Sequence, residues 1–215
     1  MNQEELNKKI ELHQEWLNSN KKKGKKLNLN GEDLSRFHLK GSLAFADLSN
    51  TNLSWIKLSC NLYRANLRGA NLSYANLKRA FLYGANLSGA NLKRANLIEA
   101  DLQQSNLIGA DLRHADLNNA DLSYANLLDA NLENISLITA NLYKITLPKN
   151  YKIINSTYLI IANKKNKTIK IGCKYLTLES WEKNGIEIAS KQQLTKEQIE
   201  TLKDDINLIK LWFEN

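Results

Sequence analysis

The residue types that most often perform acid–base, nucleophilic or metal chemistry are few and widely spaced in this chain. Its three histidines, His13, His38 and His114, lie far apart in the sequence, and its two cysteines, Cys60 and Cys173, form no Cys-x-x-Cys pair. The sequence also contains no phosphate-binding glycine loop and no metal-ligand spacing. We therefore expect no catalytic residue, no metal and no cofactor, and we predict that the protein is not an enzyme.

Aspartates are more regularly placed, and paired carboxylates can act as general acid and base. Four aspartates, however, stand where a five-residue repeat usually has asparagine, so we interpret them as structural: Asp101, Asp111, Asp116 and Asp121. Cys60 stands where the same repeat usually has alanine, which predicts a buried and unreactive thiol. His114 falls at an outward position and is interpreted as a solvated side chain.

The repeat that contains these residues has a period of five. A leucine recurs at every fifth position from Leu62 to Leu147, and the same step occurs upstream from Leu29 to Leu39 and from Leu43 to Leu58. Five matches neither the helical period of 3.6 nor the strand period of 2, but a short extended segment followed by a corner satisfies it. The leucine, and the alanine two residues before it, would then point inward, while the other three positions face water.

Stacking is required for such a coil to be stable. Each buried leucine contributes roughly 1.5–3 kcal/mol, but one coil alone buries almost nothing, so successive coils must cover one another. An Asn-Leu-x-Gly-Ala pattern recurs every 20 residues at Asn66, Asn86 and Asn106, which favours four units per coil. Gly84, which lies 15 residues after Gly69, fits three units instead.

The regular step shortens at two places. It falls to four residues between Leu39 and Leu43 and again between Leu58 and Leu62. Because the two slips are 19 residues apart, which is one shortened coil, they predict a tightened corner at the same edge of the first coils.

The repeat resembles that of the pentapeptide repeat family, whose motif is A(D/N)LXX, over about residues 27–149. The resemblance implies an all-β solenoid, a right-handed quadrilateral parallel β-helix, with α/β end caps. Residues Ile171–Trp181 are similar to a segment in the C-terminal tails of some bacterial and phage pentapeptide proteins. No activity of that tail follows from the similarity.

Three regions are expected. Residues 1–26 form an N-terminal helix and a basic linker, 27–149 the β-helix, and 150–215 a capping module with a hairpin and a helix. The first helix, Gln3–Asn18, has Leu6, Ile10, Trp16 and Leu17 on or near one side, and a lysine-rich linker follows it.

The C-terminal module begins near Tyr151. A hairpin is predicted from Tyr158–Ala162 and Thr168–Cys173, a short helix from Thr177–Lys183, and a capped helix from Thr195 to about Phe213. One narrow apolar stripe on the last helix could dock on the end of the solenoid or form a dimer seam: Ile199, Leu202, Ile206, Ile209 and Phe213.

Charge divides the repeat into two belts, although the whole chain carries a net charge of +8. The first belt has basic residues and no acid: Lys57, Arg64, Arg68, Lys78, Arg79, Lys93 and Arg94. The second, from Ala95 to Ala140, has seven acids and only Arg113 as a base. Both belts spread around the circumference, so neither predicts a specific groove.

Aromatic residues gather on one side. Six of them fall at outward positions of units that share a face, with Arg64 beside them: Phe45, Tyr63, Phe81, Tyr83, Tyr124 and Tyr143. Aromatic residues and arginine are typical of protein interfaces. The alternative is that the N-terminal helix or the C-terminal module folds back over this face.

These features favour a non-enzymatic scaffold that binds an unidentified protein partner, with a homodimer as an open alternative. The family resemblance adds a second hypothesis, a modulator of DNA gyrase that mimics duplex DNA, but the net basic charge disfavours it. Binding of nucleic acid or another anionic surface by the basic belt is a third, less favoured hypothesis. The sequence has no leader pattern and no run long enough to span a membrane, so we expect a cytoplasmic protein.

Overall fold

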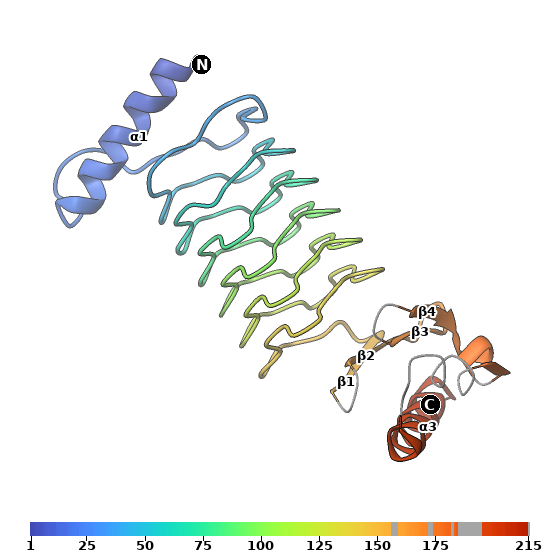
Figure 1. Cartoon of the computed structure of the whole chain (residues 1–215). Coiled ribbons are helices and arrows are strands. Elements are labelled where there is room, and N and C mark those ends of the chain that lie inside the picture. The colour runs from blue at the N-terminus through green and yellow to red at the C-terminus, as the bar shows by residue number, and fades with distance from the viewer. Residues whose placement is uncertain (156–158, 172–173, 182, 185–194, 215) are drawn as a thin grey trace. The chain divides into compact units, whose positions relative to one another are not determined.

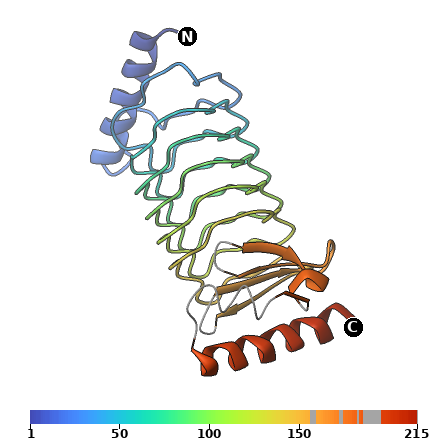
Figure 2. The same cartoon turned by 45° about the vertical axis from the view of Figure 1, so that its right-hand side comes forward.

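A computed structural model describes residues 1–155, 159–171, 174–181, 183–184 and 195–214 of the chain. The chain divides into two compact units, Met1–Leu147 and Pro148–Asn215 (Figures 1 and 2). The regular elements are α1 (Gln3–Asn18), β1 (Tyr151–Asn155), β2 (Leu159–Asn163), β3 (Thr168–Ile171), β4 (Lys174–Thr177) and α3 (Lys196–Glu214).

The repeat forms a stack of parallel coils, which Figure 1 shows from blue through green to yellow. Neighbouring coils are joined by parallel bridges between residues 20 positions apart, as in Asn66 with Asn86 and Asn86 with Asn106. Twenty residues are four five-residue units, so the spacing of Gly69 and Gly84 does not reflect a three-unit coil.

The first coils are one residue shorter. Bridges join residues 19 apart from Asn28 with Asp47 to Lys57 with Asn76, and 20 apart from Asn61 with Phe81 onward. The backbone N–H of Leu43 donates to the carbonyl of Asn61 at 2.8 Å, which aligns the units that follow the two four-residue steps. The prediction that both slips share one corner is confirmed.

The interior of the solenoid consists mainly of leucine and alanine. The leucines from Leu43 to Leu137 in the five-residue series are buried, as are the alanines two residues before them. In the last coil, Leu142 and Leu147 are only partly buried. Because each leucine lies against the leucine of the next coil, the core is a column that gains apolar contact with every added coil.

Asparagine and aspartate hold the turns. The Oδ1 of Asn66 accepts the backbone N–H of Arg68 at 3.3 Å, while its Nδ2 donates to Asp47 in the preceding coil at 3.0 Å. The turn needs only the oxygen, so aspartate can replace asparagine there. The carboxylates singled out in the sequence all accept the backbone N–H two residues later, which confirms their structural role: Asp101, Asp111, Asp116 and Asp121.

The last residue of each unit turns the corner with a positive φ. The value is +55° at Asn50, +61° at Trp55 and +59° at Tyr74, and several equivalent positions carry glycine. This left-handed conformation favours glycine and asparagine, so bulky side chains at the corner are costly to the backbone. The corner also directs these side chains away from the core.

Helix α1 belongs to the first unit and begins with a capping box between Asn2 and Glu5. Its bounds match the prediction, but its buried side is made of Leu6, Ile10 and His13. Trp16 and Leu17, which were expected on or near that side, are only partly buried, although they lie three and four residues after His13.

Side chains of α1 bond to the backbone of the first coil. The Gln3 amide donates to the carbonyl of His38 at 3.1 Å and accepts its N–H at 3.0 Å, and Gln14 donates to the carbonyl of Ser42 at 2.6 Å. The His13 ring bonds through Nε2 to the carbonyl of Ala44 at 3.0 Å and accepts the N–H of Leu27 at Nδ1, at 3.1 Å. These bonds satisfy backbone groups that have no preceding coil to pair with.

The second unit is built on an antiparallel sheet with the strand order β1-β2-β3-β4. The predicted hairpin is present as β2 and β3, joined through residues 164–167. Strands β1 and β4 were not predicted from the sequence. Tyr158 and Cys173, which bound the predicted hairpin, lie outside the described residues.

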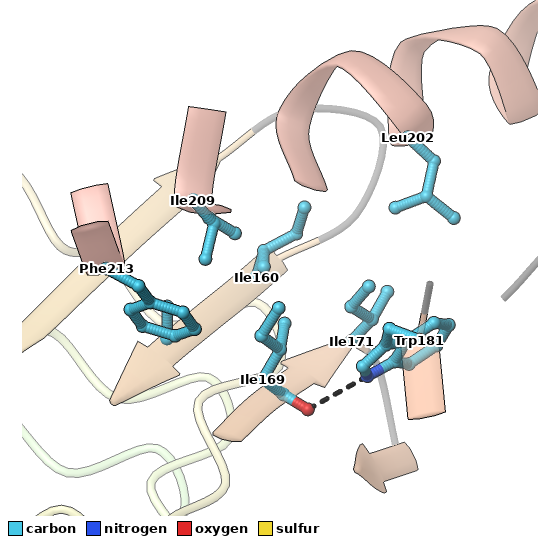
Figure 3. Close-up of a cluster of buried hydrophobic side chains, with 8 residues drawn as sticks. Ile160, Ile169, Ile171, Trp181, Leu202, Ile209 and Phe213 are labelled. Atoms are coloured by element: carbon cyan, nitrogen blue, oxygen red, sulfur yellow. Dashed lines mark hydrogen bonds between the residues drawn. The ribbon is translucent and has the colours of Figure 1, made fainter. Parts of the chain in front are cut away.

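Helix α3 packs on this sheet (Figure 3). Its residues Leu202, Ile209 and Phe213 join the buried cluster, and Ile199 and Ile206 pack against it. The apolar stripe therefore contacts the sheet of its own unit, which is a different partner from the solenoid end or second chain that the sequence suggested. A stripe shows that a helix is covered on one side, but not by what.

Trp181 completes this cluster from the short helical segment at 178–181. Its indole Nε1 donates to the carbonyl of Ile169 at 3.1 Å, which satisfies the one polar group of a buried ring (Figure 3). The predicted helix N-cap is also present, because Gln198 and Thr195 exchange the two bonds of a capping box.

Ser105 offers a test of the column. It occupies an inward alanine position, is 1% exposed, and its Oγ is the one buried side-chain oxygen or nitrogen without a hydrogen-bond partner among the described residues. Ser105→Ala should raise the free energy of unfolding by about 1–3 kcal/mol, because an unsatisfied hydroxyl leaves the core. Urea denaturation followed by circular dichroism measures the change.

Thr51 is the matched control for this substitution. It also lies at an inward position, but its hydroxyl donates to the carbonyl of Leu48 at 2.6 Å. Thr51→Ala should bring no such gain. Equal stabilisation of both variants would contradict the argument.

The contact between α1 and the first coil should depend on pH. Burial lowers the pKa of His13 below its ordinary value of 6.5, since the site holds a neutral ring that accepts one bond and donates the other. The unfolded chain then binds a proton more readily than the folded one. The free energy of unfolding should be constant above pH 6.5 and fall as the pH decreases below it.

His13→Gln is the control, since an amide can also donate to Ala44 and accept from Leu27 but does not titrate. Carboxylates with a lowered pKa, such as Asp111, lose their contribution only near and below their ordinary value of 3.8. The difference between wild type and variant, measured by urea denaturation from pH 7.5 to 5.0, should therefore isolate His13. A difference that does not vary with pH would refute the assignment.

Candidate functional site

Within the described part of the chain, the residues with catalytic potential are not brought together. Cys60 is partly exposed rather than buried, because it lies at the shortened corner, but desolvation still raises the pKa of its thiol to about 11. The thiol is therefore protonated and unreactive at neutral pH. Among the described residues, no group of three or more histidine, cysteine, aspartate or glutamate side chains could hold a metal ion.

Four of the predicted interface residues form a continuous cluster, called here the lateral aromatic surface: Phe45, Tyr63, Phe81 and Tyr83. Phe45 meets Tyr63 edge to face, with ring centroids 5.3 Å apart. Tyr63 then stacks on Phe81 at 5.9 Å and on Tyr83 at 5.8 Å in the next coil. These distances lie in the range of favourable aromatic pairs, so the rings hold one another in place.

Cations flank this surface. The Lys21 Nζ lies 4.8 Å from the centre of the Phe45 ring, and the Arg64 Cζ lies 5.3 Å from that of Tyr63. Both distances are within the range of a cation–π interaction. The surface therefore offers apolar ring area bordered by positive charge.

Tyr124 and Tyr143 form a separate pair further along the same side. Their rings meet at 5.5 Å, and Lys144 lies 5.2 Å from the centre of Tyr143. Gln103 and Gln104 occupy the coil between this pair and Tyr83. The aromatic residues that the sequence grouped on one face therefore make two clusters instead of one.

The N-terminal helix contacts the lateral aromatic surface at Phe45, in the coil nearest the N-terminus. Trp16 meets Phe45 edge to face at 6.4 Å, and its neighbour in the linker, Lys21, lies over both rings. Phe81, two coils away from Phe45, remains 40% exposed. Helix α1 thus borders the surface without covering it.

The basic and acidic belts contact each other. Glu99, near the start of the acidic belt, pairs with Arg79 through a hydrogen-bonded ion pair and with Lys78 at 3.6 Å. The hydrogen bond from Arg79 is the main reason why the pKa of Glu99 is lowered. Two members of the basic belt are thereby engaged by the protein itself.

The other members of the basic belt are distributed over different sides. Lys57, Arg68 and Lys93 make no ion pair within the described part of the chain, and Arg64 and Arg94 lie over aromatic rings. Within the acidic belt, Arg113 pairs with Asp111 at 2.6 Å, and this hydrogen bond lowers the pKa of the carboxyl. The acidic surface is therefore partly neutralised.

One cluster was missed from the sequence. Trp55, Tyr74 and Arg94 stack on one another at a corner on a different side of the solenoid. The spacing in the sequence could have indicated it, since these residues are 19 and 20 positions apart and stand at the same place in their units. It could be recognised only once the coil length at each position was known.

Comparison with known proteins decides the family. The model of the pentapeptide repeat family matches in eight copies over residues 60–97, 95–134 and 115–147. Rfr23, a pentapeptide repeat protein of the cyanobacterium Cyanothece 51142, is 30% identical over 57% of this chain and 85% of its own, with a TM-score of 0.42. The chain belongs to the pentapeptide repeat family. The matches of the family model end at residue 147, where the first unit ends.

Two further solved structures of pentapeptide proteins are similar. HetL of Nostoc sp. strain PCC 7120, which is involved in the regulation of heterocyst differentiation, is 35% identical over 58% of this chain, with a TM-score of 0.38. The chain spans 63% of the length of HetL. The plasmid-mediated fluoroquinolone resistance protein QnrB1 is 15% identical over 58% of this chain and 92% of its own, with a TM-score of 0.22.

The search of curated proteins gives no match for this pentapeptide repeat protein. Within the described part of the chain, the helices are too short or too polar to cross a lipid bilayer.

Proposed function

We propose that this pentapeptide repeat protein is a non-enzymatic scaffold whose protein partner binds the lateral aromatic surface. The observation that carries the proposal is the continuous contact from Phe45 through Tyr63 to Phe81 and Tyr83. Aromatic residues bury much area at a small cost in side-chain entropy, and they are enriched at the centre of protein interfaces. The rings are already ordered by stacking, so a partner meets a preformed surface.

The fold supports this role. Four five-residue units per coil agree with the right-handed quadrilateral β-helix that the family resemblance implies. We assign α1 the role of an N-terminal cap, because its side chains bond to the otherwise open edge of the first coil. We also propose that the protein acts in the cytoplasm. The second unit then serves either as a cap or as a further part that binds the partner.

Mimicry of DNA toward gyrase is less well supported. A mimic of a polyanion needs a continuous negative surface. Here Glu99 and Asp111 are paired with arginines, and the carboxylates at turn positions accept backbone hydrogen bonds. The net charge of +8 adds to this argument.

The test removes two rings of the lateral aromatic surface. Serine already stands at the equivalent place of the same column at Ser123, so Tyr63→Ser with Tyr83→Ser should keep the fold. Affinity capture from the source-cell lysate, followed by quantitative mass spectrometry, should show the recovered partner reduced about tenfold or more, because the variant loses central interface residues.

Ile98→Ser is the matched control. It replaces a partly buried apolar residue at the same place of a unit on another side of the coil. A partner set that is unchanged in the double variant, or reduced equally in the control, would contradict the proposal.

A further inference from the structure

The Trp55 stack, defined as Trp55, Tyr74 and Arg94, contains the most exposed aromatic ring of the solenoid, that of Trp55. The Trp55 and Tyr74 rings are parallel, with an interplanar angle of 4° and centroids 4.2 Å apart. The Arg94 Cζ lies 5.6 Å from the centre of the Tyr74 ring. Each member lies one coil from the next, so the stack follows from the register of the coils.

The fold does not require large side chains here. Trp55 is 71% exposed and Tyr74 is 37% exposed, so neither ring belongs to the core. Both occupy corner positions with positive φ, where asparagine costs less and where Asn50, Asn119 and Asn134 already stand. Two exposed rings at strained corners therefore suggest a role outside the folded core.

The surroundings of the stack are basic. Residues 48–98 contain no aspartate or glutamate, and Lys93 lies next to Arg94 in the chain. The nearest acid on the same side of a later coil is Asp111, which Arg113 already engages. On the same side of the first coil, Asp33 accepts bonds from Ser35 and Asn52. Arg94 is exposed and makes no ion pair within the described part of the chain, whereas the charge of Lys93 also acts on Asp111 in the next coil.

We propose that the Trp55 stack is a second docking surface, which binds an acidic segment of a protein partner. Tryptophan, tyrosine and arginine are the residues most enriched among those that dominate binding energy at interfaces. The indole edge would contact an apolar side chain of the segment, and Arg94 and Lys93 would pair with its carboxylates. Single-stranded nucleic acid fits less well, because successive bases need successive free ring faces, and in this stack only Trp55 has a face that no other member covers.

This surface lies away from the lateral aromatic surface. The units of Tyr63 and Tyr83 centre on Leu62 and Leu82, and those of Tyr74 and Arg94 centre on Leu72 and Leu92. The two sets are ten residues apart, which is two of the four units of a coil, so they lie on opposite sides. The inference goes beyond the proposed function, since the scaffold would hold two partners at once.

The experiment uses the intact chain and a defined probe, a phage-displayed library of random twelve-residue peptides. Peptides that bind the wild type should be rich in aspartate and glutamate with an apolar residue among them. Synthetic copies, measured by fluorescence anisotropy, should bind Trp55→Asn about 30-fold more weakly, as expected for a dominant interface residue. Arg94→Asn should also weaken binding, and its difference from the wild type should become smaller as the salt concentration rises, because salt screens the charge pairing that the variant has lost.

Three controls test which surface binds, whether the variant folds and which class of ligand is bound. The Tyr63→Ser and Tyr83→Ser variant should bind the same peptides with unchanged affinity, so failure of the proposed function leaves this result intact. Circular dichroism should show that Trp55→Asn unfolds at the same urea concentration as the wild type or a higher one. A twelve-nucleotide oligo(dT) should bind wild type and Trp55→Asn equally.

Three results would overturn the proposal. One is a selection in which no peptide is enriched more strongly on the protein than on support without protein. Another is a set of acidic peptides that bind Trp55→Asn as tightly as wild type. The third is oligo(dT) binding that is lost in Trp55→Asn, which would assign the stack to nucleic acid instead.

Discussion

The hydrogen bonds between successive coils determine the rest of the solenoid. They fix each residue above its equivalent 19 or 20 positions away, as in Asn61 with Phe81 and Asn66 with Asn86. Under this register the leucines form a single inward column, and no leucine could be buried without it. Loss of register by one residue would turn every inward side chain toward water.

The same register makes each outward position a column. Asparagine side chains bond from coil to coil, aromatic rings stack, and Arg79 meets Glu99 in the next coil. A residue one coil away is therefore a closer partner than most neighbours in sequence. The two candidate surfaces arise in this way, and both depend on a chain backbone that is rigid before any partner arrives.

The two ends of the chain are covered in different ways. The first coil has no preceding coil, and α1 supplies hydrogen bonds from Gln3, His13 and Gln14 in its place. The second unit has its own sheet and its own buried cluster around Ile160 and Ile209, which α3 covers. The apolar stripe of α3 is thereby packed inside that unit.

The sequence by itself determined the solenoid, the bounds of α1, the β2–β3 hairpin and the capped start of α3, because these follow from periods and caps within a few residues of one another. It also placed Tyr63 and Tyr83 on one side. Only the tertiary structure decided that α3 packs on its own sheet, that His13 is buried, and that Trp55 stacks on Tyr74. These contacts join residues distant in sequence, and a local pattern shows that a side chain has a partner without specifying which one.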